Sequence, residues 1–266
     1  MRKPTALVFD IDDTLVPFRA AELPASTKEA LRLARQNGHT LFLATGRSKV
    51  YILPWIIDEV QPRAITSCNG MMQYTPQGEI LSVHRFSEAD FLGVLNDCLQ
   101  NDIAFACKFP QGMAVYHQYE RFCDFYLVGG ATRTGLKDDT LLRNTHEEWG
   151  MPLDLFMHGD LETIFSFMKK YPSLQTVKAR SQAAEAYPAS FNKSTGVREM
   201  LEKSGFRLEE AICFGDSQND REMLKEAGIG VAMGNASDEV KACADYVTSD
   251  VREDGIYNAF RHLELI

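Results

Sequence analysis

Acidic side chains follow two of the apolar runs of this chain, and carboxylates in such positions can attack an electrophile, transfer a proton or hold a cation. Asp10, Asp12 and Asp13 come directly after the first run, and Asp216 and Asp220 come after a later one. Asp10 and Asp12 lie where a strand would end, so both can face one cleft. One of them can then serve as a nucleophile and the other as a proton donor.

These carboxylates need a cation if they share one cleft, because charges of like sign repel one another strongly where water screens them only in part. Oxygen ligands without a paired histidine or cysteine favour a hard divalent ion, and Mg²⁺ is the expected cofactor. The simpler alternative is that each carboxylate caps a helix or solvates a loop. The joint occurrence of polar residues at several strand ends favours the metal site.

Short apolar segments alternate with helical ones in both terminal parts of the chain, as expected for a parallel sheet with helices on both faces. The strands expected near the site are residues 6–9, 40–44, 64–68 and 211–214. The helices expected among them are residues 26–37, 49–60 and 194–203. Ser26 and Glu29 have the spacing of a capping box at the start of the first helix.

Ligands of such sheets bind beyond the carboxyl ends of the strands, so the residues that follow each strand should converge. Thr45, Gly46 and Arg47 follow the second expected strand, Asn69 follows the third, and Asn219 lies in the later acidic segment. All of these are residue types that bind ligands or tighten turns.

The middle of the chain has a different pattern, in which short strands mix with helices. We expect residues 84–186 to form an inserted α+β domain. Residues 1–83 and 187–266 should together form one α/β domain with a doubly wound, Rossmann-like parallel sheet.

Taken together and in order, these motifs resemble the haloacid dehalogenase-like (HAD) phosphatases, specifically the Cof-type subgroup, whose large C2-type cap is inserted after the third strand. The resemblance spans nearly the whole chain. It rests on Asp10-Ile11-Asp12-Asp13-Thr14-Leu15, Ala44-Thr45-Gly46-Arg47, Cys68-Asn69-Gly70, Lys193, Phe214-Gly215-Asp216-Ser217-Gln218-Asn219-Asp220 and Val231-Ala232-Met233-Gly234-Asn235-Ala236.

The resemblance implies that Asp10 attacks phosphorus in line and forms an aspartyl-phosphate, while Asp12 protonates the leaving oxygen and later activates water. It also implies that Mg²⁺ is held by the Asp10 carboxylate, the Asp12 backbone carbonyl and Asp216, with Asp220 orienting these ligands. Lys193 would neutralise charge on the phosphoryl oxygens, a large contribution in phosphoryl transfer.

The resemblance further implies a set of residues that contact the substrate or its phosphate. They are Thr14, Thr45, Gly46, Arg47, Lys193 and Asn219. Three of them have simpler alternatives: Lys193 as a surface lysine that opens a helix, Arg47 as part of an exposed salt bridge, and Thr14 as a loop cap.

Asp13 stands where the Cof-type pattern usually has glycine. If the backbone there requires a positive φ, Asp tolerates it better than most residues. We therefore expect the activity to be retained.

Composition restricts the partners and the compartment. The formal net charge of −9, without a basic run, argues against nucleic acid and anionic membrane as partners. Six scattered cysteines without a Cys-x-x-Cys pair, and the absence of a signal peptide or an apolar stretch long enough to span a membrane, favour a cytoplasmic enzyme. We expect a small phosphate ester as the substrate and a monomer or weak homo-oligomer.

Three functions fit the acidic segments. The leading one is a phosphatase acting on a small phosphorylated metabolite, with sugar phosphates first. The second is a phosphotransferase or mutase of the phosphomannomutase type. The third is a non-enzymatic, phospho-accepting signalling domain, which would have its acceptor carboxylate after the third strand, where this chain has Asn69.

Overall fold

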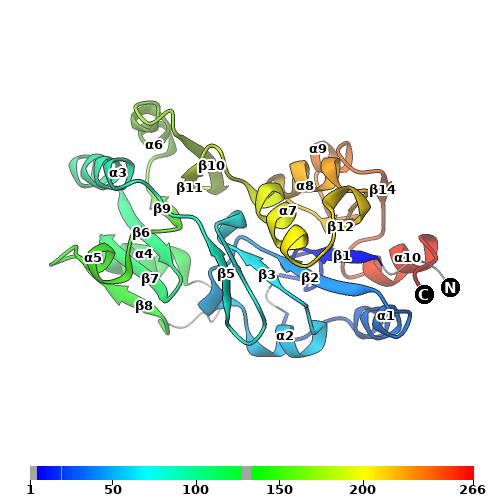
Figure 1. Ribbon diagram of the computed structural model, residues 1–266. Coiled ribbons are helices and arrows are strands. Elements are labelled where there is room, and N and C mark those ends of the chain that lie inside the picture. Colours follow the sequence, from blue (N-terminus) through cyan, green and yellow to red (C-terminus); the bar gives the residue numbers. More distant parts are fainter. Residues whose placement is uncertain (1–4, 19, 128–132) are drawn as a thin grey trace. The chain divides into compact units, whose positions relative to one another are not determined.

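The structure is a computed structural model of the 266-residue chain, and it describes residues 5–18, 20–127 and 133–266. The chain divides into two compact units (Figure 1). The first comprises the described residues of Met1–Arg47, Ile52–Ser82 and Lys193–Ile266, and the second those of Ser48–Tyr51 and Val83–Asn192.

The first unit is built on an eight-stranded sheet with the strand order β14-β13-β12-β1-β2-β3-β4-β5. Neighbouring strands from β14 to β3 are parallel, and β4 is antiparallel to β3. The strands are β1 (Ala6–Phe9), β2 (Thr40–Ala44), β3 (Ile65–Ser67), β4 (Met72–Tyr74), β5 (Ile80–Val83), β12 (Ile212–Gly215), β13 (Ile229–Ala232) and β14 (Tyr246–Val247).

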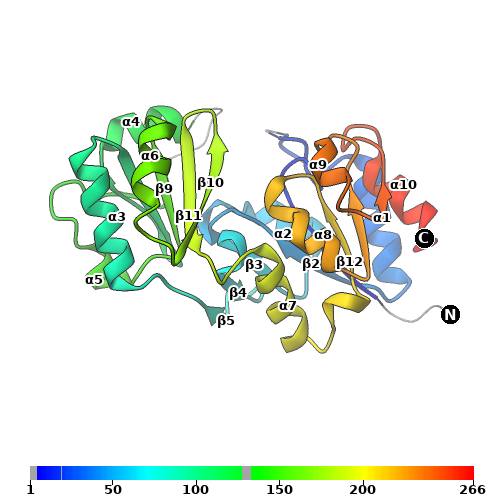
Figure 2. The same ribbon diagram turned by 90° about the horizontal axis from the view of Figure 1, so that it is seen from above.

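Helices cover both faces of this sheet (Figures 1 and 2). Alternate residues of β1 and β2 pack with Val197 of α7 and Met223 of α8. The opposite face packs on α10, where the rings of Phe9 and Phe260 lie 6.0 Å apart. Because both faces are covered, β1 is apolar and buried at every position. The helices are α1 (Ala25–Gln36), α2 (Pro54–Val60), α7 (Lys193–Lys203), α8 (Arg221–Glu226), α9 (Asp238–Lys241) and α10 (Gly255–His262).

Short 3₁₀ turns complete this part of the chain. They are η1 (Lys49–Tyr51), η2 (Cys68–Gly70), η3 (Leu208–Glu210) and η4 (Gln218–Asp220).

Two expectations about helices of the N-terminal part were wrong. The first helix begins one residue before Ser26 with Pro24 at its N-cap and no capping side chain, and Glu29 pairs with Arg32 instead of closing a capping box. The expected helix 49–60 is interrupted: a 3₁₀ turn ends at Tyr51 and α2 starts at Pro54. Proline cannot donate the backbone hydrogen bond that a continuous helix would need there.

The second unit is a six-stranded sheet in the order β10-β11-β9-β6-β7-β8, antiparallel except for the β7–β8 pair. Helices α3 and α6 pack on one face, and α4 packs on the other. The strands are β6 (Ala104–Phe109), β7 (Gly112–His117), β8 (Leu136–Asp138), β9 (Asp154–His158), β10 (Leu174–Arg180) and β11 (Ala183–Pro188). The helices are α3 (Glu88–Gln100), α4 (Tyr119–Tyr126), α5 (Thr145–Trp149) and α6 (Leu161–Met168).

The boundaries of the second unit differ from those expected for an inserted domain over 84–186. The unit continues to Asn192, because β11 runs on to Pro188, and it takes in the 3₁₀ turn at Lys49–Tyr51. Residues 128–132, which fall within the expected domain, lie outside the described residues.

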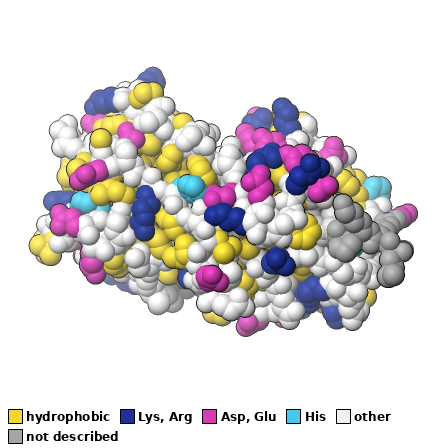
Figure 3. Space-filling model, in the orientation of Figure 1, with side chains coloured by type: hydrophobic (Ala, Val, Ile, Leu, Met, Phe, Trp, Pro, Cys, Tyr) yellow, Lys and Arg dark blue, Asp and Glu magenta, His cyan; other side chains and the backbone are white. Residues whose placement is uncertain are grey.

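Charged side chains of both signs are interspersed on the face of the molecule shown in Figure 3. Among the described residues, no helix has the length and apolar character needed to cross a membrane.

Candidate active site

The carboxyl ends of three neighbouring strands bring the expected site residues of the first unit together. In the parallel register Phe9 lies beside Leu43 on one side and Phe214 on the other. The chain leaves β1 at Asp10, β2 at Thr45 and β12 at Asp216, so these residues lie at the same edge of the sheet.

The loop after β1 is a tight turn. Leu15 and Val16 both donate their backbone N–H to the Ile11 carbonyl, and Asp13 donates its own to the Val16 carbonyl. Asp13 has φ +56°, so the backbone conformation that usually calls for glycine is present, and Asp adopts it. Its side chain accepts a hydrogen bond from the Phe18 N–H at 2.8 Å, which holds the loop closed.

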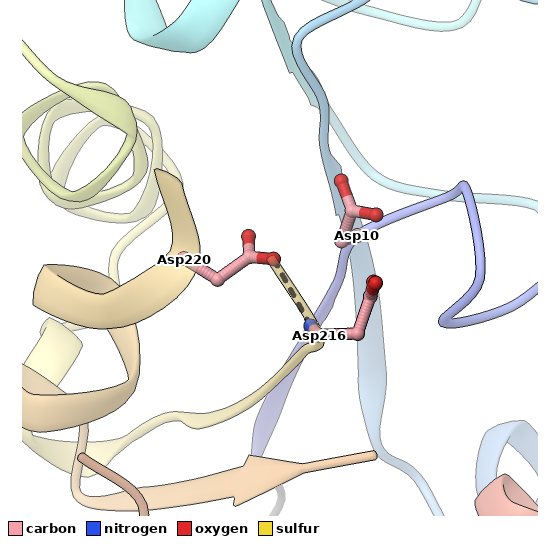
Figure 4. A group of neighbouring side chains, drawn as sticks. All are labelled: Asp10, Asp216 and Asp220. Carbon is pink, nitrogen blue, oxygen red and sulfur yellow. Dashed lines mark hydrogen bonds between the residues drawn. The ribbon is translucent and has the colours of Figure 1, made fainter. Parts of the chain in front are cut away.

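Three carboxylates converge beyond the strand ends (Figure 4). Asp10, Asp216 and Asp220 each place a carboxylate oxygen within 4.8 Å of the others, and within the described part of the chain this is the group of acidic, histidine or cysteine side chains suited to a metal ion. Asp10 and Asp220 are buried, and Asp216 is partly exposed. The two acidic segments, which were expected to converge, therefore lie together beyond the strand ends.

Lys193 is the cation of this cluster. Its Nζ donates to Asp10 Oδ1 at 2.5 Å and to Asp220 Oδ1 at 2.6 Å, and its side chain is completely buried. The alternative of a surface lysine therefore does not describe it. Lys193 is the first residue of α7, and this helix lies so close to η2 that a Cβ on Gly196 would come 2.3 Å from the Gly70 Cα.

Asp220 organises the loop after β12. Its Oδ2 accepts the backbone N–H of Asp216 at 3.0 Å and that of Ser217 at 2.9 Å, while Oδ1 accepts from Lys193. Gly215 is required here, because a Cβ at that position would lie 2.6 Å from the Asp220 carboxyl carbon. Asp220 thus fixes the positions of both Asp216 and Lys193.

Thr14 and Arg47, which were expected to contact the substrate, hydrogen-bond to aspartates of the site. Thr14 donates its hydroxyl to Asp216 Oδ1 at 2.7 Å. Arg47 binds Asp12 through two hydrogen bonds, Nε to Oδ2 at 2.8 Å and Nη2 to Oδ1 at 2.5 Å. The Asp12 side chain therefore lies on the Arg47 guanidinium, apart from the metal-binding group.

Thr45, Gly46 and Asn219 lie at the edge of the site. The buried Thr45 hydroxyl accepts the Arg47 backbone N–H at 3.1 Å. The amide of Asn219 donates to Asn69 Oδ1 at 2.9 Å, and a Cβ on Gly46 would come 3.0 Å from the same oxygen. Glycine at position 46 leaves room for this pair.

Two asparagines to which the sequence prediction gave no role, Asn69 among the strand ends expected to converge and Asn235 in a motif of the resemblance, also hold the site together. Asn69, with φ +52°, is the partner of Asn219. Asn235 donates to the Asp13 carbonyl at 2.8 Å and accepts the Val251 N–H at 3.0 Å, so it ties the loop after β1 to a distant loop. The sequence signal that could have identified them is their place in the motifs Asn69-Gly70 and Gly234-Asn235.

The electrostatics of the cluster show an excess of negative charge. Burial raises the pKa of Asp10 well above its ordinary range; Lys193 opposes this shift, and the neighbouring carboxylates add to it. Burial and then Asp220 raise the pKa of Asp216 to about 7. Burial would lower the pKa of Lys193, but Asp10 and Asp220 together raise it above its ordinary value, so the ammonium keeps its charge.

The donor set fits Mg²⁺. Carboxylate oxygens of Asp10 and Asp216 are hard ligands in a buried place where negative charge exceeds the one cation that Lys193 supplies. Asp220 already accepts three hydrogen bonds, so it is better suited to orient these ligands than to join them. The Asp12 side chain is held by Arg47, which leaves the Asp12 backbone carbonyl as its contribution.

Residues 7–260 match the family model of the haloacid dehalogenase-like hydrolases. The chain belongs to this family. The match covers most of both units, in agreement with the resemblance that the motifs of the sequence carry. It confirms the family, and the sheet order confirms the α/β fold class with a parallel core.

The chain is similar over most of its length to relatives that are named phosphatases. The chain is 26% identical over 269 residues to the pyridoxal phosphate phosphatase YbhA of Escherichia coli (strain K12). This alignment covers 94% of this chain and 95% of YbhA. It is 25% identical over 261 residues to the 5-amino-6-(5-phospho-D-ribitylamino)uracil phosphatase YitU of Bacillus subtilis (strain 168). This alignment covers 96% of this chain and 95% of YitU.

Solved structures are similar over the same length. The structure of the HAD subclass IIB sugar phosphatase BT4131 matches with a TM-score of 0.86 and 29% sequence identity, covering 98% of this chain and 100% of that one. These comparisons confirm the enzyme class, a phosphatase of the HAD-like hydrolases, and the resemblance to its Cof-type subgroup.

Proposed function

We propose that this protein is a Mg²⁺-dependent phosphatase that hydrolyses a small phosphorylated metabolite through an aspartyl-phosphate on Asp10. The observation that carries the proposal is the position of the Asp10 carboxylate, buried at the end of β1, bonded to Lys193 at 2.5 Å and grouped with Asp216. A nucleophile in this place has positive charge beside the site where a phosphoryl group would be bound.

The proposed reaction has two steps. An oxygen of the Asp10 carboxylate attacks phosphorus, the bond from phosphorus to the ester oxygen breaks, and Asp12 gives that oxygen a proton. In the second step Asp12 takes a proton from water, the water oxygen attacks phosphorus, and Asp10 is released as the free carboxylate together with inorganic phosphate.

Asp10, Asp216 and the Asp12 backbone carbonyl are the groups that would hold Mg²⁺, with Asp220 fixing the loop that carries Asp216. The ion supplies positive charge for the phosphoryl oxygens when it is bound. The contribution of Lys193 is to neutralise the nucleophile's surroundings and to orient Asp10. Asn219 and Thr45 are proposed to contact the phosphoryl group or nearby substrate atoms.

The substrate is proposed to be a small phosphate monoester, with sugar phosphates the first class to test. The names of the relatives support this size class: they include a pyridoxal phosphate phosphatase and a sugar phosphatase. The catalytic role falls to the first unit, which carries all the site residues, and substrate selection is assigned to the second unit, residues Val83–Asn192.

The test is hydrolysis of 4-nitrophenyl phosphate with and without Mg²⁺ by the full chain and by Asp10→Asn. We expect activity that requires the metal and falls by about 10³-fold or more in Asp10→Asn, because the nucleophile is lost. Asp58→Asn, on the exposed face of α2, is the matched control and should retain full activity. Hydrolysis by Asp10→Asn at the wild-type rate would refute the proposal, and transfer of phosphate between sugars without release of inorganic phosphate would point to a mutase.

A further inference from the structure

Arg47 and Asp12 form a two-point ion pair at the edge of the site. Arg47 Nε lies 2.8 Å from Asp12 Oδ2, and Nη2 lies 2.5 Å from Oδ1. The planar guanidinium matches the two carboxylate oxygens, which fixes the orientation of the carboxylate as well as its place. The side chains are 26% and 36% exposed, so the pair lies within reach of a ligand that enters from solvent.

The backbones of both residues are fixed independently of the pair. Asp12 forms a β-bridge with Val16 inside the closed loop after β1. Arg47 donates its N–H to the Thr45 hydroxyl and accepts the Cys68 N–H at its carbonyl at 3.0 Å. These backbone contacts therefore fix the Cα atoms of both residues. The ion pair in turn fixes the orientation of the Asp12 side chain.

This arrangement has a consequence for proton transfer. Both oxygens of the Asp12 carboxylate accept one hydrogen bond from the guanidinium, and each keeps a second lone pair through which Asp12 can exchange a proton with a substrate oxygen. The two bonds fix the plane of the carboxylate and so the direction in which these lone pairs point. A lysine at position 47 would keep the charge but could not make both bonds in one plane.

We propose that Arg47 is a positioning residue for Asp12: it orients the proton donor through its two-point ion pair and does not bind the phosphoryl group of the substrate. The inference rests on the proposed function of Asp12. It replaces the sequence expectation that Arg47 contacts the substrate phosphate, and it makes the pair, rather than Asp12 alone, the unit that protonates the leaving group.

Leaving groups of different basicity separate the two roles of Arg47. The oxygen of 4-nitrophenol leaves without a proton, whereas the alkoxide of an alkyl phosphate such as glycerol 3-phosphate needs one. The value of kcat/KM covers the steps up to the first irreversible one, here the departure of the leaving group, and so does not include the later attack of water. A residue that acts through Asp12 affects the alkyl ester, and a phosphate ligand affects both esters.

The experiment measures kcat/KM of the full chain for both esters in Arg47→Met and Arg47→Lys, and inhibition by inorganic phosphate. We expect a loss of about 10- to 100-fold for the alkyl ester, less than about 3-fold for the aryl ester, and inhibition by phosphate unchanged within about 2-fold, since general acid catalysis contributes about 10²- to 10⁴-fold. Arg207→Met, an exposed partner of Glu210, is the control for loss of an arginine.

Equal losses for the two esters, or phosphate inhibition that weakens as much as kcat/KM, would overturn the inference and make Arg47 a phosphate ligand. A double variant distinguishes an effect through Asp12 from general damage to the fold. In an Asp12→Asn background, Arg47→Met should not lower kcat/KM for the alkyl ester any further. A further loss there contradicts the inference. If the wild-type protein hydrolyses neither ester, the proposed function fails first, which distinguishes the two failures.

Discussion

Lys193 is surrounded by carboxylates from two different segments of the chain. Its ammonium bonds both Asp10 and Asp220, and all three side chains are buried. A charge group of this kind is stable only as a whole, because the removal of one partner leaves the others buried and unpaired. The residue therefore serves the fold and the proposed chemistry together.

Replacement of Lys193 by Met should destabilise the folded protein by about 3 to 5 kcal/mol, because Asp10 and Asp220 lose their buried cation. Urea unfolding followed by circular dichroism measures this in the metal-free protein. Lys225→Met, at an exposed position of α8, is the control and should change stability by less than about 0.5 kcal/mol. A loss below about 1 kcal/mol for Lys193→Met would show that the cluster does not depend on this cation.

The contribution of Asp216 to the stability of the metal-free protein should fall as pH rises from about 4 to about 7. The pKa of Asp216 is about 7 in the folded protein, above its ordinary value of 3.8, so the folded state holds a proton that the unfolded state has released over this range. Stability that depends on this proton is present at low pH and is lost as the carboxyl ionises. Mg²⁺ at about 100 times its Kd should restore about 2.7 kcal/mol above pH 7.

Thermal unfolding at pH 5 and pH 8, with and without Mg²⁺, checks this linkage. Asp216→Asn is the matched variant: without metal it should be more stable than the wild type at pH 8, and Mg²⁺ should no longer raise its Tm. If Mg²⁺ stabilised Asp216→Asn as much as the wild type, Asp216 would not be a ligand.

The elements around the site explain which parts of it the sequence could predict. Parallel strands end at the same edge of a sheet, so the motifs after β1, β2 and β12 were expected to meet, and Asp10, Asp216, Asp220 and Lys193 do lie together. The positive φ of Asp13 could likewise be anticipated, because the residue stands where the family has glycine.

Other features depend on side-chain directions or on single residues within an element. The sequence left a salt bridge open as the alternative for Arg47, but spacing along the chain could not name Asp12 as the partner that offers it both carboxylate oxygens. Ser26 and Glu29 have the spacing of a capping box, yet Pro24 starts the helix earlier and places Ser26 inside its first turn.

Helix α7 provides a test at the scale of an element. Alanine favours a helix over glycine by about 1 kcal/mol, so propensity alone predicts that Gly196→Ala stabilises the protein. The structure predicts the reverse, because the new Cβ would lie 2.3 Å from the Gly70 Cα and would push α7 away from η2. We expect a loss of about 1 to 3 kcal/mol.

Urea unfolding and phosphatase activity of Gly196→Ala should be measured beside Glu202→Ala, on the exposed side of the same helix. Activity should fall together with stability in the first variant, because α7 begins at Lys193 and carries it into the site. A more stable and fully active Gly196→Ala would mean that the contact with Gly70 does not position the lysine.

The whole chain divides its tasks between two units. The first unit is assembled from both ends of the chain and holds every residue of the candidate site. The second comprises Val83–Asn192 and the short segment Ser48–Tyr51, and it has its own sheet and cores. Sequence patterns anticipated an insertion in this part of the chain, but its limits shifted because β11 extends to Pro188 and because the turn at Lys49–Tyr51 joins the second unit.

The central claim concerns the whole enzyme in turnover: Asp10 carries the phosphoryl group between the two steps. The most direct measurement is an acid quench during steady-state hydrolysis, reduction of the acyl phosphate with borohydride, and peptide mass spectrometry. We predict a reduced residue at position 10 that requires both substrate and Mg²⁺ and is absent from Asp10→Asn. A reduced residue at position 12 instead of position 10 would contradict the account. So would an active enzyme in which rapid quenching yields no reduced carboxylate.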